Sequence, residues 1–139
     1  MKRILVINGP NLNLLGVREP DVYGSRSYDD LVGFIMDKAA SLNLDVRVLQ
    51  SNHEGAIVDM IQQALDGTDA IVINPAAYTH TSVAILDALK AVGLPTVEVH
   101  LSDISSREEF RRFSYVSLYA EKTISGMGFD GYAEALEYL

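Results

Sequence analysis

Cysteine is absent from the 139 residues of this chain, which excludes disulfides, thiol nucleophiles and metal sites built on thiolates. Basic residues are few, because 11 lysines and arginines stand against 19 acidic residues and give a formal net charge of -8. So acidic a composition argues against a general affinity for nucleic acid. An anionic ligand must therefore meet a local cluster of basic side chains.

Long apolar runs are also missing. None approaches the roughly 18 residues that a membrane span needs, and the N-terminus lacks the apolar stretch and small-residue cleavage site of a secretory signal. We therefore expect a soluble, cytoplasmic protein with no membrane partner. A length of 139 residues at 48% hydrophobic content predicts one compact domain over residues 1–139.

Short apolar runs alternate with segments of helical period along the chain. The apolar runs predict strands at residues 3–7, 45–50, 70–74, 95–100 and 122–125. Helices are predicted at about 27–42, 57–65, 81–92 and 131–139, with a short helix whose start is boxed by Ser105 and Glu108. Five β-α units with short connections predict an α/β, flavodoxin-like three-layer sandwich around a five-stranded parallel sheet in the order 2-1-3-4-5.

Three polar segments follow strands of this sheet. They are NGPNLNLLGVREPDVYG at 8–24, NPAAYTHTS at 74–82 and HLSDISSREEFRR at 100–112. Open α/β sheets bind ligands beyond the carboxyl ends of their strands, so the three segments should converge there. The first is either a surface loop or, because it is long and keeps apolar residues, a functional lid that carries Arg18 and Tyr23.

Side-chain alternation places Glu98 and His100 on one face of the strand at 95–100. A carboxylate inside a buried strand is costly unless it is paired, and pairing with His100 would fix the imidazole tautomer and raise its basicity. The pair is either a core ion pair or part of a catalytic site. The chain's three scattered histidines do not form a metal site.

The segment after this strand is rich in arginine. Arg107 and Arg111 are four residues apart and share a helical face, and Glu108 and Arg112 form an i,i+4 pair on the neighbouring face. The run is either a solvated charged helix or the basic cluster that an anion needs. His80 precedes a predicted helix whose first amides favour anions, although alone it is more often a capping or surface residue.

Four separated segments, in the right order, resemble type II 3-dehydroquinate dehydratase. They are GPNLNLLGVREPDVYG, NPAAYTHTS, VEVHLSDISSREEFRRFSY and GFDGYAEAL. The resemblance implies a lyase of the shikimate or quinate pathway that converts 3-dehydroquinate reversibly to 3-dehydroshikimate by anti elimination of water through an enolate. It also implies a subunit that assembles as trimers into a homododecamer and works without a metal or cofactor.

The resemblance further implies residue roles. Tyr23 is the base that removes the C2 proton as tyrosinate, and Arg18 on the same loop supports it. His100, oriented by Glu98, is the general acid that protonates the departing C1 hydroxyl. Asn11 matches a residue that holds a water near the enolate oxygen, and Arg107 matches an arginine near the base. The groups that bind the substrate are matched by Asn74, His80 and Arg111, with the backbone amides of Leu101 and Ser102.

The resemblance also bears on three further positions. Asp87 matches an acid that reaches the site from a neighbouring subunit. Ala76 stands where many relatives have glycine, which puts the loop before His80 in question, and Phe113 stands where many have histidine.

A non-catalytic flavodoxin-like module that binds a small ligand is the alternative function. A phospho-receiver of this fold needs paired acids after the first strand and an aspartate after the third, but Asn8 and Asn74 occupy those strand ends. Flavin binding needs a Ser/Thr-rich phosphate loop after the first strand, which is also absent.

Overall fold

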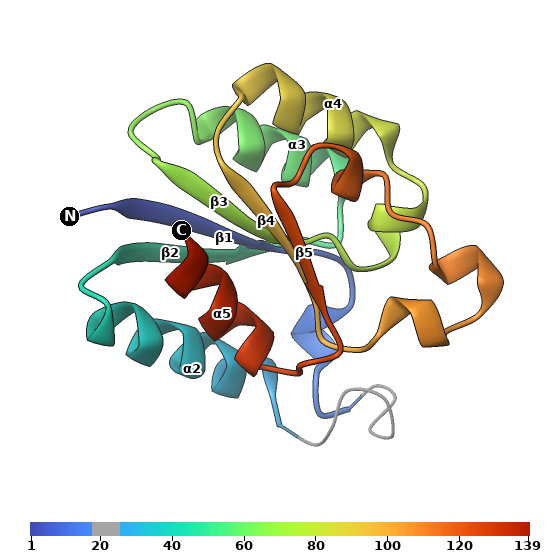
Figure 1. Cartoon of the computed structure of the whole chain (residues 1–139), viewed down its shortest axis with the longest axis horizontal. Coiled ribbons are helices and arrows are strands. Elements are labelled where there is room, and N and C mark those ends of the chain that lie inside the picture. The colour runs from blue at the N-terminus through green and yellow to red at the C-terminus, as the bar shows by residue number, and fades with distance from the viewer. Residues whose placement is uncertain (18–25) are drawn as a thin grey trace.

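A parallel five-stranded sheet lies between two layers of helices in the computed structural model, which describes residues 1–17 and 26–139 (Figure 1). The strand order is β2-β1-β3-β4-β5, as predicted. The strands are β1 (Arg3–Asn8), β2 (Asp45–Gln50), β3 (Ala70–Asn74), β4 (Thr96–His100) and β5 (Lys122–Ser125). The strand order reverses between β1 and β3, so this is where a ligand crevice is expected.

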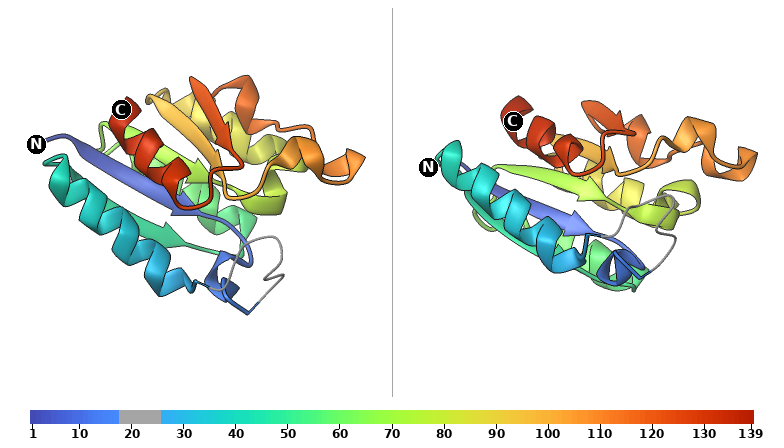
Figure 2. Two further views of the ribbon diagram at one scale, coloured as in Figure 1. Left: turned by 60° about the horizontal axis from the view of Figure 1, so that its bottom comes forward. Right: turned by 90° about the horizontal axis from the view of Figure 1, so that it is seen from below.

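The helices cover both faces of the sheet, with α2 and α5 on one face and α3 and α4 on the other (Figures 1 and 2). They are α2 (Tyr28–Ser41), α3 (Glu54–Gln63), α4 (Val83–Val92) and α5 (Asp130–Tyr138). Each layer packs on its own apolar core because side chains alternate along the strands. In β1, for example, Ile4 and Val6 face α2 and α5, whereas Leu5 and Ile7 face α3 and α4. No helix in the described ranges is both long and apolar enough for a membrane span.

Local sequence signals set the helix ends. Ser27 and Asp30 form the predicted capping box, in which the Ser27 side chain accepts from the amide of Asp30 and the Asp30 carboxylate accepts from the amide of Ser27. Gly93 ends α4 at a φ of 72°, a left-handed conformation that glycine adopts at little cost. Helix α4 begins at Val83, slightly later than predicted, because the Ser82 hydroxyl caps it by accepting from the amide of Ile85.

The predicted short helix boxed by Ser105 and Glu108 is wrong. Two 3-10 turns, η3 (Ile104–Ser106) and η4 (Glu109–Arg111), stand there instead. The Asp103 carboxylate accepts from both the amide and the hydroxyl of Ser105, and the backbone is extended at Arg107, so no helix continues.

The predicted ion pair between Glu108 and Arg112 is wrong for the same reason. Once the helical spacing is lost, the Glu108 carboxylate instead lies 2.8 Å from the Nε atom of Arg111. Arg112 Nε donates to the carbonyl of Arg107.

The turn that follows β3 contains a left-handed alanine. η2 (Ala76–His80) begins at Ala76, whose φ of 52° disfavours a side chain with a Cβ atom. The Asn74 side chain accepts from the amide of Ala76 at 3.1 Å and holds the backbone in this conformation. Glycine at position 76 would therefore relieve strain.

We predict that Ala76→Gly raises the free energy of unfolding by up to about 1 kcal/mol, since relief of the left-handed strain exceeds the entropy cost of glycine. Ala40→Gly, at an exposed position in α2, is the matched control and should lower stability by about 0.5 to 1 kcal/mol. Urea unfolding of both variants measures the two effects. A loss of stability in Ala76→Gly similar to that in Ala40→Gly would contradict the strain.

Candidate active site

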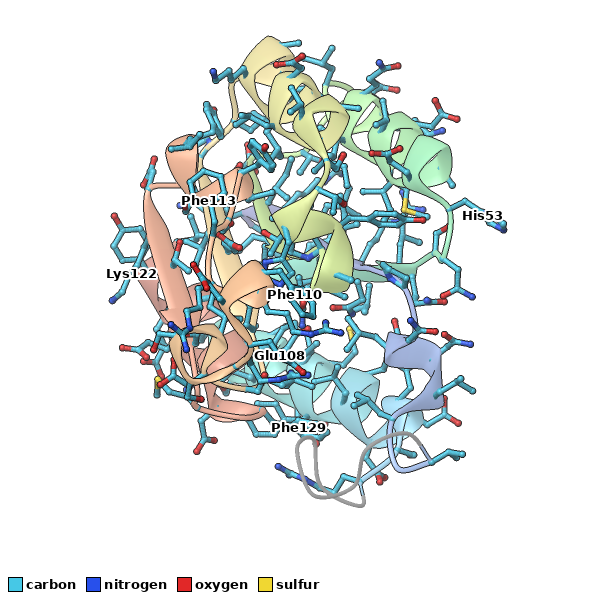
Figure 3. All side chains as sticks on the ribbon, turned by 90° about the vertical axis from the view of Figure 1, so that its right-hand side faces the viewer. His53, Glu108, Phe110, Phe113, Lys122 and Phe129 are labelled. Atoms are coloured by element: carbon cyan, nitrogen blue, oxygen red, sulfur yellow. The ribbon has the colours of Figure 1, made fainter. Side chains whose placement is uncertain are left out.

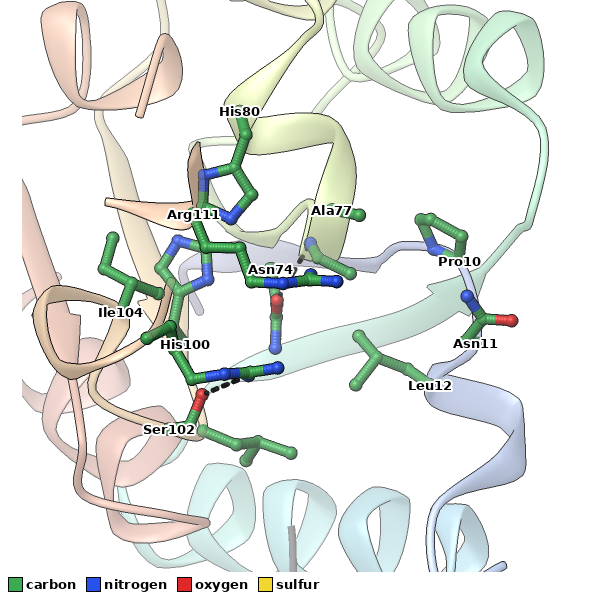
Figure 4. A pocket seen from close by; sticks show the side chains of 13 residues that line it. Pro10, Asn11, Leu12, Asn74, Ala77, His80, His100, Ser102, Ile104 and Arg111 are labelled. Carbon is green, nitrogen blue, oxygen red and sulfur yellow. Dashed lines mark hydrogen bonds between the residues drawn. The ribbon is translucent and has the colours of Figure 1, made fainter. Parts of the chain in front are cut away.

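A cavity of about 510 Å³, including space open to solvent, lies at the carboxyl ends of β1, β3 and β4 (Figure 4). Its wall contains residues from all three polar segments, which therefore converge as predicted. The strand ends are packed closely here. The amide of Gly9 donates to the carbonyl of Asn74 at 2.8 Å, and a Cβ atom on Gly9 would lie 2.5 Å from the carbonyl oxygen of Pro75. A side chain at position 9 would thus force β1 and β3 apart beneath the cavity.

Most of the predicted site residues border this cavity. Those in its wall are Asn11, Asn74, His80, His100, Leu101, Ser102, Arg107 and Arg111. Glu98 lies beneath His100 on the same strand. Asp87 is exposed on α4 and is not part of the wall of its own subunit. Arg18 and Tyr23 lie outside the described residues.

The centre of the site is the ion pair of Glu98 and His100. Glu98 is fully buried and His100 is 5% exposed, and the Nε2 atom of the imidazole bonds to the Oε2 atom of the carboxylate. This contact uses Nε2 and leaves Nδ1 for a ligand in the cavity. The two side chains are neighbours on one strand face, as the alternation in the sequence predicts.

Three hydroxyl groups, which the sequence did not reveal as part of the site, surround the Glu98 carboxylate. Oε2 accepts from the hydroxyls of Thr79 and Ser114, each at 2.7 Å, and Oε1 accepts from the hydroxyl of Thr123 at 3.1 Å. The backbone amide of Ser117 donates to the Ser114 oxygen, which leaves the Ser114 proton for the carboxylate. We call Thr79, Ser114 and Thr123 the hydroxyl cage.

His100, together with Ser114 and Thr79 of the cage, keeps Glu98 ionised inside the protein. Burial raises the pKa of the Glu98 carboxyl, but the hydrogen bond and positive charge of His100 and the hydroxyls of Ser114 and Thr79 outweigh burial, so this pKa lies below its usual range. The imidazole of His100 therefore contacts a buried negative charge at the edge of the cavity.

His80 offers a different chemistry from His100. Its Nδ1 atom lies 2.8 Å from the carbonyl oxygen of Phe113, which can only accept, so Nδ1 carries the proton. Partial burial lowers the pKa of His80, and the positive charges of His100 and Arg111 lower it further. At neutral pH the ring is therefore uncharged, and its Nε2 atom is an acceptor for a ligand hydroxyl.

Two arginines supply the positive charge that an acidic protein needs to bind an anion. The Nη1 atom of Arg107 donates to the hydroxyl of Ser102 at 3.3 Å, and Arg111 also borders the cavity (Figure 4). Glu108 lies 2.8 Å from the Nε atom of Arg111 and 3.9 Å from that of Arg107, and so holds both guanidinium groups in place. Figure 3 looks onto this side of the molecule, where Glu108 and Phe110 are labelled.

Asn11 enters the cavity from the opposite side. Its backbone is left-handed at a φ of 69°, and its backbone N–H donates to Oδ1 of Asn52 at 3.0 Å. Gln50 in turn donates to the same Asn52 oxygen at 3.0 Å and to the carbonyl of Gly9 at 3.1 Å. The polar residues at the end of β2 thus fix the start of the loop that follows β1.

The chain has extensive similarity to known proteins. A family model for class II dehydroquinase matches residues 2–139. The chain is 59% identical over 136 residues to a catabolic 3-dehydroquinase of Verticillium alfalfae, which covers 98% of this chain and 91% of that protein. It is 57% identical over 137 residues to a 3-dehydroquinate dehydratase of Caldicellulosiruptor saccharolyticus, with 98% and 94% covered. The crystal structure of a type II dehydroquinase from Butyrivibrio crossotus matches with a TM-score of 0.97 at 50% identity over 99% of this chain and 96% of that one.

The flavodoxin-like fold carries the Glu98–His100 ion pair beside a cavity bordered by two arginines, and the matches identify the class of enzyme. The chain belongs to the class II dehydroquinase family. Its activity is that of a hydro-lyase, the dehydration of 3-dehydroquinate. The family resemblance of the four sequence segments is thereby confirmed, and the alternative of a non-catalytic binding module is set aside.

We predict that Thr79→Val lowers the free energy of unfolding by about 1 to 3 kcal/mol at neutral pH, because it leaves a buried carboxylate oxygen short of one donor. The ionised form of Glu98 contributes stability above the unfolded carboxyl pKa of about 4.3 and loses it as the pH falls through the lower folded pKa. The deficit of the variant should therefore shrink on acidification.

Urea titrations from neutral pH down to well below pH 4, through the lowered pKa of Glu98, measure this deficit. Thr81→Val makes the same chemical change at an exposed position and serves as the control, with little expected effect. A deficit that stays constant across the pH range would show that Thr79 does not act through the charge of Glu98.

Proposed function

We propose that this enzyme dehydrates 3-dehydroquinate by an anti elimination through an enolate, with the tyrosinate of Tyr23 as base and His100 as general acid. The observation that carries the proposal is the buried, ionised Glu98 bound to an imidazole that borders a cationic cavity. A strand places this pair rigidly, and a general acid needs a fixed position and a nearby proton.

The acid half of the reaction is assigned to His100. Glu98 and the hydroxyl cage stabilise the imidazolium, and its remaining ring nitrogen donates a proton to the C1 hydroxyl as the C1–O bond breaks. Water leaves, and the electron pair of the enolate forms the new double bond. A positioned general acid typically contributes a rate factor of about 10² to 10⁴.

Substrate binding is assigned to the groups around the acid. The substrate carboxylate lies against the backbone amides of Leu101 and Ser102, close to the arginines. Asn74, His80 and Arg111 bind the hydroxyls and the carboxylate. The acceptor nitrogen of neutral His80 is suited to a hydroxyl, and this supports its role.

The base half is assigned to Tyr23, which removes the C2 proton. An unperturbed tyrosine has a pKa near 10, so only about one in a thousand is ionised at pH 7, a cost of roughly 4 kcal/mol. One cation within hydrogen-bonding range lowers a pKa by about 1 to 3 units. Arg18 together with Arg107, which borders the cavity, can therefore offset this cost.

The enolate that forms after proton removal needs a hydrogen-bond donor. Asn11 is assigned as the residue that holds a water near the enolate oxygen, and its fixed backbone in the cavity wall supports this role. No metal ion or cofactor takes part in the proposed steps. In the described residues, no three His, Asp or Glu side chains gather as metal ligands would.

We predict that Tyr23→Phe lowers kcat by at least about 10²-fold while the product still binds, because the ring keeps its shape but cannot accept the C2 proton. The ultraviolet absorbance of the conjugated product follows turnover, and calorimetry follows binding. Tyr138→Phe, exposed on α5, is the control and should leave turnover unchanged. Full turnover in Tyr23→Phe would refute the assignment of the base.

We further propose that the enzyme is a homododecamer, a tetramer of trimers, in which Asp87 enters the site of a neighbouring subunit. Asp87 is exposed on α4 and takes no part in the cavity wall of its own chain. Several large apolar side chains close in sequence to the arginines are exposed to solvent. Their exposed fractions are 70% for Phe110, 53% for Phe113 and 61% for Leu118. Such side chains are typical of surfaces that other subunits cover.

We predict that Asp87→Ala alone loses most activity, and that co-assembly with inactive Tyr23→Phe subunits restores part of it. In a mixed cyclic trimer, an Asp87→Ala subunit receives the intact carboxylate from a Tyr23→Phe neighbour. Random equal mixing should give about a quarter of the wild-type activity. Activity of the co-expressed mixture, compared with that of each variant alone, measures this. No gain on mixing would contradict a shared site.

The setting of the reaction is also a proposal. We place the enzyme in the cytoplasm and in the shikimate pathway of aromatic amino acid biosynthesis. The relative from Caldicellulosiruptor saccharolyticus is named a 3-dehydroquinate dehydratase and the one from Verticillium alfalfae a catabolic 3-dehydroquinase, so quinate breakdown is the alternative setting.

A further inference from the structure

Tyr132 is a fully buried tyrosine whose hydroxyl joins the ends of the two central strands. It lies on α5, and its side chain reaches across the end of the sheet to β1 and β3. Asn8 and Asn74 are paired residues at the ends of these two strands. The Tyr132 hydroxyl lies 2.6 Å from Oδ1 of Asn8 and 2.9 Å from Nδ2 of Asn74. Both asparagines thus bond to one phenol.

The direction of each hydrogen bond follows from the atoms involved. Oδ1 of Asn8 can only accept, so the Tyr132 hydroxyl donates to it. The same hydroxyl oxygen then accepts from Nδ2 of Asn74. Oδ1 of Asn74 accepts from the amide of Ala76 at 3.1 Å. Both ends of the Asn74 amide are therefore fixed, and one N–H bond remains for the cavity that Asn74 borders.

The phenol is suited to this role because it does not ionise in the working range of pH. Burial raises the pKa of Tyr132 far above that of an exposed tyrosine. The hydroxyl therefore keeps its proton and continues to donate to Asn8. Phenylalanine would fill almost the same space, so packing alone does not explain the hydroxyl.

We propose that Tyr132 is a positioning residue for substrate binding, because its hydroxyl orients the Asn74 amide so that the remaining N–H points to a hydroxyl of the substrate. The proposal rests on the proposed role of Asn74 as a substrate-binding residue. Helix α5 supplies no residue to the cavity wall, and through Tyr132 it would still contribute to substrate recognition. Tyr132 touches no reacting atom, so its removal should weaken binding more than it slows the chemical step.

Tyr132→Phe tests the proposal in steady-state assays of the full-length enzyme. We expect KM to rise about three- to tenfold, the effect of one misaligned neutral hydrogen bond, while kcat stays within about threefold. Tyr119→Phe is the matched control. It removes the hydroxyl of a half-buried tyrosine, which donates to the carbonyl of Leu94 at 2.8 Å, away from the cavity. This control should leave KM unchanged even if it lowers the melting temperature.

A double-mutant cycle with Asn74→Ala separates this inference from the proposed function. If Asn74→Ala raises KM and Tyr132→Phe in that background adds nothing, the two side chains act as one unit. If Asn74→Ala leaves KM unchanged, the binding role of Asn74 is wrong, and the inference falls with it. If Asn74→Ala raises KM and Tyr132→Phe does not, the inference alone is overturned.

Asn8→Ala is the second variant in case Tyr132→Phe does not fold. It keeps the phenol but removes the acceptor that fixes the hydroxyl proton, so a smaller rise in KM with kcat preserved is expected. An unchanged KM in the folded Asn8→Ala enzyme would then overturn the proposal. A fall in kcat with no change in KM in this variant would also overturn the proposal, because it indicates a general loss of structure.

Discussion

The ionised carboxylate of Glu98 is the charge on which the rest of the site depends. It is fully buried, and a buried charge persists only where hydrogen bonds and an opposite charge replace water. The hydroxyl cage and the His100 imidazole supply this replacement. The cage comes from η2, from the segment after η4 and from β5, so the folding of three separate elements stabilises one buried negative charge beneath the cavity.

The same segments also arrange the cations and the second histidine. Thr79 directly precedes His80, and Ser114 directly follows Phe113, whose carbonyl accepts from His80. The chain that stabilises the Glu98 charge therefore also fixes the proton on His80, and it continues back into the turn that carries Arg111. His100, His80 and Arg111 are therefore positioned by connected segments of the chain.

The sequence predicted the parts of this arrangement that follow from local pattern. Buried β-branched runs give the strands, their order follows from the β-α alternation, and the period of two along β4 pairs Glu98 with His100. The fold class and strand order are confirmed, and so is the convergence of the polar segments. The roles of individual residues stay predictions.

What the sequence did not predict depends on long-range contacts or on local competition. Thr79, Ser114 and Thr123 are separated by up to 44 positions, and nothing local marks them as partners of one carboxylate. The sequence indicates only an aromatic core residue at Tyr132, and the hydrogen bonds of its hydroxyl to two strand ends appear only in the structure. The helix expected from Ser105 does not form because the Asp103 carboxylate accepts from the backbone amide of Ser105. Helical periodicity in the sequence does not show this competing hydrogen bond.

The position of Thr123 on β5 links the environment of Glu98 to partial unfolding of the sheet. β5 is an outermost strand of the sheet, paired with β4 on one side. Outermost strands detach at a lower free-energy cost than central ones. Detachment of β5 would strip one donor from Glu98 while the interior of the sheet stayed intact, so turnover reports on the attachment of this strand and should decline before the molecule as a whole melts.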